Sequence, residues 1–146
     1  METPETKKTV NKINPKTAEA EFERFVEAWD IDADLEDMEV EDQKSFEDQK
    51  RRIVKAIKKG RAIISDDGKT VEYKLLEPVH DHTSIKMKIP RGSSFMAMDR
   101  YKEKQQIHKM NAFMASSSGL PVQVFSNMDG RDLKFCMGIA LLFLAS

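Results

Sequence analysis

The sequence predicts an α+β protein that is mostly helical and has a small antiparallel sheet, formed as a β-hairpin or three strands. Large apolar residues recur with helical spacing in the first third of the chain. Short runs rich in Ile, Val and Tyr then surround an Asp-Gly pair, and helical patterns return after residue 92. The chain has 146 residues and 40% apolar content, which is enough for one compact core.

The N-terminal third predicts an arm followed by two helices. Residues 1–16 are polar and show no hydrophobic period, so we expect a disordered arm. Apolar side chains share one helical face over residues 17–29, with Thr17 as the expected N-cap. A second helix is expected over residues 42–59, and Gly60 suits its left-handed end.

The middle of the chain predicts the sheet. Residues 62–65 and 70–76 form the expected hairpin, because the Asp-Gly pair between them favours a tight turn. Pro78 is expected to end the second strand, since proline cannot donate to a sheet ladder. Residues 84–89 alternate apolar and charged side chains, which predicts a half-exposed third strand.

The C-terminal part predicts three more helices. Ser93 or Ser94 can cap one long helix that ends near residues 116–119. A short helix begun by a proline is expected within residues 120–128. Asp129 then caps a last helix that runs to the end of the chain.

Composition restricts the class of protein. The 24 basic and 25 acidic residues give a net charge of −1, so no nucleic-acid partner is expected. Cys136 is the only cysteine, which fits a reducing compartment. The N-terminus lacks the apolar core of a secretory signal, and the apolar run 137–145 is about half of the ~20 residues that cross a bilayer. We therefore expect a cytoplasmic protein with no membrane contact.

An acidic stretch between the first two predicted helices admits a calcium hypothesis. Asp30, Asp32, Asp34 and Glu41 occupy positions 1, 3, 5 and 12 of an EF-hand loop. Leu35, however, stands at the sixth position, where the sharp turn of that loop needs glycine. We favour an acidic, solvated linker and keep a calcium-binding helix-loop-helix module as an alternative.

Motifs for catalysis are lacking in the sequence. It contains no nucleophile elbow, phosphate-binding glycine loop, zinc-protease motif or redox cysteine pair. His80 and His82 flank Asp81, yet a metal site needs three or four converging ligands. We predict a protein that is not an enzyme, with no catalytic residue, no metal and no cofactor.

Charge reverses abruptly along the second predicted helix. Residues 30–48 hold ten carboxylates and one lysine, whereas residues 49–61 hold seven basic residues and no acid. Part of this asymmetry stabilises the helix through its macrodipole. The basic stretch has no aromatic residue for base stacking, so we expect it to contact its acidic neighbour or a protein partner rather than DNA.

The C-terminal helix is apolar on every side. No charged side chain follows Lys134. Such a helix must be covered all round, so it is either central in the fold or meets another molecule. We favour self-association or client binding over a plain core helix. The candidate partner-binding residues are Phe125, Leu133, Phe135, Met137, Leu141 and Phe143.

The order of segments from Thr70 onward resembles the small cytoplasmic phage tail assembly chaperones. The segments are TVEYKLLEPV, IKMKIPRGSSFMAMD, a long polar helix, SSSGLPVQVFSNMDGRDL and the apolar end, and they cover roughly half the chain. The landmarks within them are residues 75–78, 85–91, 118–121 and 128–132. The expected organisation is therefore an arm at 1–16, a helical pair with an acidic loop at 17–60, and a tail-assembly-chaperone-like domain at 61–146.

This resemblance implies a non-catalytic protein of the host cytoplasm. Members of the family coat the long tape measure protein before the tail tube polymerises around it, and a longer form recruits the tail tube protein. The expected partners are therefore these two proteins and further copies of the chain. A structural tail or baseplate component of the virion is the alternative.

Overall fold

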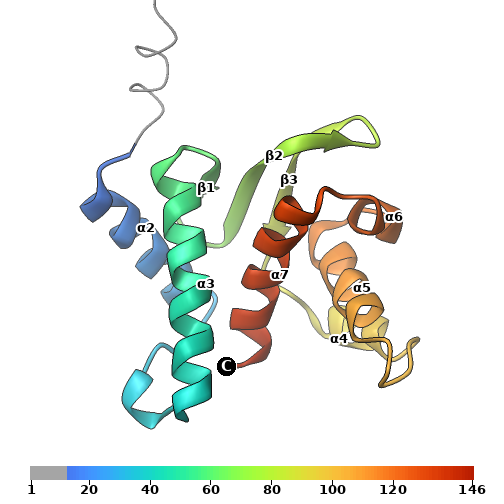
Figure 1. Ribbon diagram of the computed structural model, residues 1–146, viewed down its shortest axis with the longest axis horizontal. Coiled ribbons are helices and arrows are strands. Elements are labelled where there is room, and N and C mark those ends of the chain that lie inside the picture. Colours follow the sequence, from blue (N-terminus) through green and yellow to red (C-terminus); the bar gives the residue numbers. More distant parts are fainter. Residues whose placement is uncertain (1–12) are drawn as a thin grey trace, which may run out of the picture.

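The computed structural model describes residues 13–146 and confirms the α+β class (Figure 1). The helices are α2 (Pro15–Ala28), α3 (Val40–Lys58), α4 (Gly92–Met98), α5 (Gln106–Ser118), α6 (Val122–Ser126) and α7 (Gly130–Leu144), with a 3-10 turn η1 at Leu35–Asp37. The strands are β1 (Ala62–Ile64), β2 (Thr70–Val79) and β3 (His82–Lys88).

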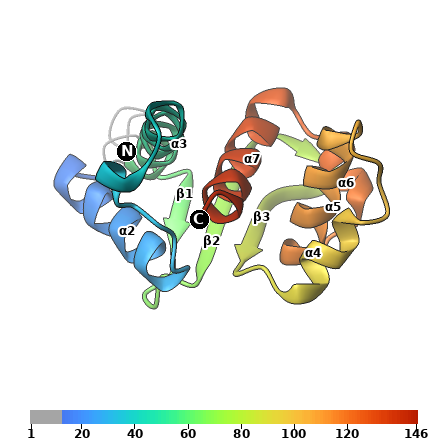
Figure 2. The same ribbon diagram turned by 90° about the horizontal axis from the view of Figure 1, so that it is seen from below.

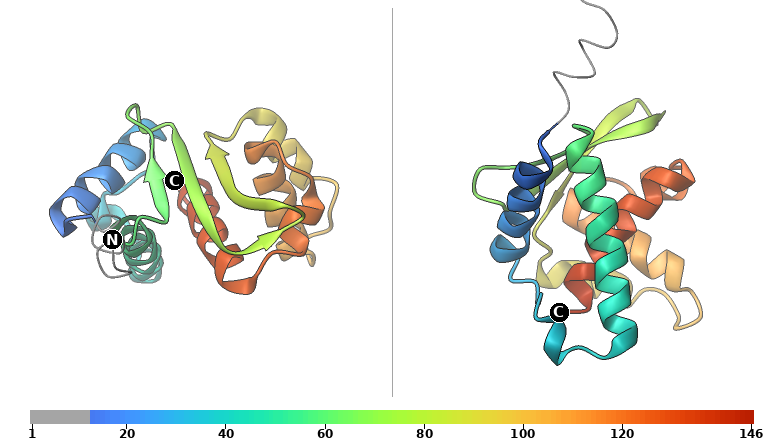
Figure 3. Two further views of the ribbon diagram at one scale, coloured as in Figure 1. Left: turned by 90° about the horizontal axis from the view of Figure 1, so that it is seen from above. Right: turned by 60° about the vertical axis from the view of Figure 1, so that its left-hand side comes forward.

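The three strands form one antiparallel sheet in the order β1-β2-β3 (Figure 3). Gly68 turns the chain between β1 and β2 with a φ of 77°, and a Cβ there would meet the Arg24 carbonyl oxygen at 2.5 Å. His80 and Asp81 take positive φ in the tight turn between β2 and β3. The predicted hairpin and third strand are therefore present.

Helices flank the sheet on two sides and cover its centre. Figure 2 shows α2 and α3 beside β1, α7 across the middle of the sheet, and α5 with α4 and α6 beside β3. One hydrophobic core includes Phe25 of α2, Ile57 of α3, Val71 of β2 and Ile139 of α7. This core is continuous across residue 60, where the sequence suggested a division.

The first helix begins closer to the N-terminus than its sequence suggested. Asn14, rather than Thr17, caps α2, and its side chain accepts a hydrogen bond from the Lys16 amide. Pro15 takes the first helical position, where its missing N–H costs nothing. The Ile13 amide donates to the Lys58 carbonyl at 2.9 Å. Of the arm predicted at 1–16, residues 13–16 are thus ordered, and 1–12 lie outside the described residues.

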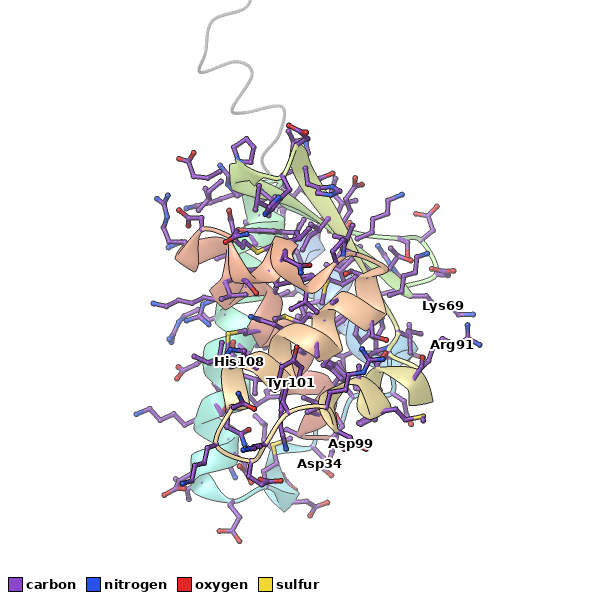
Figure 4. All side chains as sticks on the ribbon, turned by 90° about the vertical axis from the view of Figure 1, so that its right-hand side faces the viewer. Asp34, Lys69, Arg91, Asp99, Tyr101 and His108 are labelled. Carbon is purple, nitrogen blue, oxygen red and sulfur yellow. The ribbon has the colours of Figure 1, made fainter. Side chains whose placement is uncertain are left out.

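The single long helix predicted from residue 93 is wrong. The chain instead forms α4 and α5, joined by residues 99–105. These residues are almost all polar and give a helix no apolar face to bury. The break lets α5 fold back on α4, where the rings of Phe95 and Phe113 meet edge to face at 5.5 Å. Figure 4 shows Tyr101 of this loop beside His108 of α5, with ring centroids 5.6 Å apart.

Pro78 does not end the second strand, because β2 continues to Val79. The pairing of β2 with β3 becomes irregular between Lys74 and Val79. A proline is tolerated in such a segment, since no regular ladder bond is needed from it. The backbone amides of Leu76 and Glu77 in this segment find another acceptor, described below.

Candidate protein-binding surface

The inner side of α7 is part of the core. Phe135, Cys136, Ile139 and Leu142 are buried on this side. The ring of Phe135 stacks on Tyr73 of β2, with centroids 4.0 Å apart and planes 10° from parallel. Burial raises the pKa of the Cys136 thiol, so this cysteine stays protonated and unreactive.

A buried carboxylate joins α7 to the irregular part of β2. Asp132 is fully buried, and its carboxylate accepts hydrogen bonds from the Leu76 amide at 2.9 Å and the Glu77 amide at 3.2 Å. The Tyr73 hydroxyl donates to Asp132 Oδ1 at 2.9 Å. Burial, together with this hydrogen bond, raises the pKa of Tyr73 and keeps it a donor. All these contacts lie within the fold, so Asp132 is a structural anchor.

The opposite side of α7 carries a partly exposed apolar row. Leu133, Met137, Leu141 and Leu144 follow one another at spacings of three or four residues, and we call them the outer stripe. Leu141 is 38% exposed, and the other three are partly buried. Figure 2 shows the sheet on one side of α7 and no described element over the other. The outer stripe is thus a surface feature of an otherwise central helix.

The six residues predicted from sequence occupy three environments. Phe125 and Phe135 are 0% and 2% exposed and belong to the core. Phe143 is half-buried in an aromatic cluster, with Trp29 at 6.0 Å and Phe113 at 6.3 Å. The structure brings together the other three on the outer stripe, namely Leu133, Met137 and Leu141.

An acidic cavity adjoins one end of the outer stripe. It encloses about 80 Å³ between α3 and the C-terminal turns of α7. Leu141 and Phe46 contribute apolar walls, and Asp32 and Asp42 place carboxylates at its border. A ligand at this end would therefore meet an apolar floor beside negative charge.

A basic groove lies at the other end of the same two helices. This shallow space of about 370 Å³ has the stacked rings of Tyr73 and Phe135 in its wall. The basic groove is lined by six cations, Arg52, Lys55, Lys59, Arg61, Arg131 and Lys134. None of the described residues that line it is acidic. Such a surface attracts an acidic segment and repels a basic one.

Exposed apolar side chains also occur on α4 and at the start of α5. Met96 of α4 is 70% exposed and Phe95 is 45% exposed, while Ile107 at the start of α5 is 59% exposed. Sequence reasoning did not single them out, because it assigned them to one continuous helix. The ring of Phe95 also contacts Phe113 and Phe143, so part of it belongs to the core.

The acidic loop does not have the geometry of a calcium site. Within residues 13–146, no group of three or more His, Cys, Asp and Glu side chains is placed to hold a metal ion. Asp32 Oδ1 instead accepts the Asp34 amide at 2.9 Å, and the negative charge of Asp34 raises the pKa of Asp37. His80 contacts Asn127 at 2.8 Å, in a turn between strands.

Comparison with protein-family models, with curated proteins and with solved structures finds no match for this chain. None of the helices within residues 13–146 has the length and apolar character needed to cross a membrane. The surface itself is therefore the basis for a proposal about function.

Proposed function

We propose that this protein is a non-catalytic phage tail assembly chaperone, which holds the tape measure protein in the host cytoplasm until the tail tube protein assembles around it. The observation that supports the proposal is the outer stripe of α7, a row of Leu and Met side chains left partly uncovered on a central helix. The order of segments from Thr70 onward supports the family.

The chemistry of the outer stripe suits a helical client. Leucine and methionine side chains repack easily, and an amphipathic helix can lay its apolar face along such a row. Charged side chains at the two ends of α3 line the acidic cavity and the basic groove, and they keep the free protein soluble. Binding that buries a modest apolar row is reversible, as release during tube assembly requires.

The proposal is tested by coexpressing the chain with the tape measure protein of the same phage. The double variant Met137→Lys and Leu141→Lys places charge on the outer stripe, at one partly buried and one exposed position, and leaves the fully buried side chains of α7 unchanged. We expect it to stay folded by circular dichroism and to lose the soluble complex, with binding weakened at least ~100-fold, about 2.7 kcal/mol.

A matched control carries Met96→Lys and Ile107→Lys, at two exposed apolar positions outside the outer stripe, and should bind like the wild type. Normal binding by the stripe variant, or loss only in the control, would contradict the assignment. Purified virions offer a second readout, because a chaperone should be missing from them. Stoichiometric copies would indicate a structural tail component instead.

A further inference from the structure

Helices α3 and α7 form one exposed face of the molecule. They lie side by side and run in opposite directions (Figures 1 and 2). Gly138 of α7 lies against Gln49 of α3: a Cβ at Gly138 would meet Gln49 Oε1 at 2.5 Å, and the flexible Gln49 side chain would have to move aside. Helical spacing places the exposed Glu41, Arg52 and Lys59 of α3 opposite its buried Ile57, and the outer stripe of α7 opposite its buried core side. We call the surface formed by these two exposed sides the α3–α7 face.

Charge divides the α3–α7 face into two ends. The acidic end holds Asp32 and Asp42, which line the acidic cavity, and Glu41 and Asp48 of α3. Asp48 is paired with Arg51 at 2.9 Å, and Lys44 is the one basic residue there. Residues of the basic end are Arg52, Lys55 and Lys59 of α3 with Arg131 and Lys134 of α7. Within residues 13–146, Lys55, Lys59 and Lys134 take part in no ion pair. The apolar outer stripe runs between the two ends.

We infer that a second copy of this chain docks on the α3–α7 face, related by a two-fold axis that lies in the interface and crosses both helices at right angles. This axis places each acidic end on the partner's basic end, and it packs the two outer stripes antiparallel around Met137. The interface is self-complementary, as a closed dimer requires.

The charge pattern selects this axis over the other simple choice. A two-fold axis parallel to the helices would place basic end on basic end, since Lys59 of α3 and Lys134 of α7 lie at the same end. Like charges in contact oppose such a dimer. The axis that crosses the helices at right angles is therefore the two-fold arrangement that pairs each end with one of opposite charge.

The dimer is expected to be weak and sensitive to salt. Exposed ion pairs contribute little each, and salt screens them, so the charges set orientation while the outer stripe supplies apolar burial. The inference builds on the proposed holding function, because the dimer would cover the same outer stripe that binds the client. Client and second copy then compete, and the dimer protects the stripe until a client arrives.

A charge-swap experiment tests the inference without any client. One variant turns the basic end acidic with Arg52→Glu, Lys55→Glu and Lys59→Glu, and the other turns the acidic end basic with Glu41→Lys, Asp42→Lys and Asp48→Lys. Sedimentation equilibrium should show wild-type dimer at high concentration and dissociation at high salt. Each variant alone should dimerise at least ~10-fold more weakly, because the two ends of α3 now carry the same sign of charge and repel each other across the axis.

An equal mixture of the two variants should form a heterodimer at least as tight as the wild-type dimer, which also shows that both are folded. The control Lys86→Glu with Lys88→Glu, on exposed positions of β3, should leave the dimer unchanged.

A wild-type monomer at all concentrations, or a mixture that fails to associate, would overturn the inference. A mass that rises beyond a dimer would replace the two-fold axis with a head-to-tail chain. If the protein did not dimerise but still bound the tape measure protein in the coexpression test, the dimer would be ruled out and the proposed function would stand.

Discussion

The two sides of α7 are built from the same kinds of residue and have opposite environments. Ile139 is fully buried against the sheet, whereas Leu141, two residues later, is 38% exposed. Apolar composition therefore does not distinguish the part of this helix that stabilises the fold from the part that is free to bind. The neighbouring helices and the sheet decide it, since they cover one side and leave the other open.

The largest expected loss of stability follows from shortening a buried side chain on the inner side of α7. Phe135→Ala removes the ring stacked on Tyr73 and leaves a cavity, so unfolding in urea should show a loss of about 3–5 kcal/mol. Leu141→Ala on the outer stripe should lose less than ~1 kcal/mol, because much of that side chain is already in water. Equal losses from the two variants would break the distinction between the two sides.

The buried carboxylate provides the next largest effect. Asp132→Asn keeps the size of the side chain, yet an amide NH₂ faces the Leu76 or Glu77 amide, and a buried donor without an acceptor costs about 1–3 kcal/mol. Tyr73→Phe removes one hydrogen bond to the same carboxylate and should cost about 1 kcal/mol. Urea unfolding measures both. An Asp132→Asn variant as stable as the wild type would show that this anchor does not hold α7 in place.

The smallest effect concerns the exposed start of α7 and depends on pH. Asp129 accepts the Arg131 amide as N-cap, and hydrogen bonds from Arg131 lower the pKa of Asp129 to about 2. A pKa below that of the unfolded chain means that this stabilisation is present above pH ~4 and is lost as the pH falls toward 2. Asp129→Asn should lower the Tm slightly at neutral pH and lose this component of the acid dependence. If the difference in Tm between the wild type and the Asp129→Asn variant stayed constant from pH 7 to pH 2, the assignment would be contradicted.

Local signals in the sequence predicted the regular elements well. Three of these signals lie where the backbone requires their residue types. They are the glycine of the Asp-Gly pair at Gly68, the left-handed Gly60 and the N-cap Asp129. Their physical causes act within a few residues, so no knowledge of the rest of the fold is needed.

Features that depend on distant contacts could not be predicted in the same way. Asp132 is bound by amides more than fifty residues away, and the return of α5 onto α4 after the polar break at residues 99–105 depends on tertiary contacts such as that of Phe95 with Phe113. The candidate surface divides similarly. The 3.6-residue period places Leu133, Met137 and Leu141 in one row, but only the tertiary structure tells which row of α7 is uncovered.

Methionine oxidation tests the central claim most directly, namely that the outer stripe is open in the monomer and covered by a partner. Peptide mass spectrometry after mild peroxide treatment should find Met96 and Met137 oxidised in dilute protein and Met114 protected, in line with their burial. At high concentration, or with the tape measure protein bound, Met137 should become protected while Met96 stays reactive. Oxidation of Met137 at an unchanged rate in all three conditions would contradict the account.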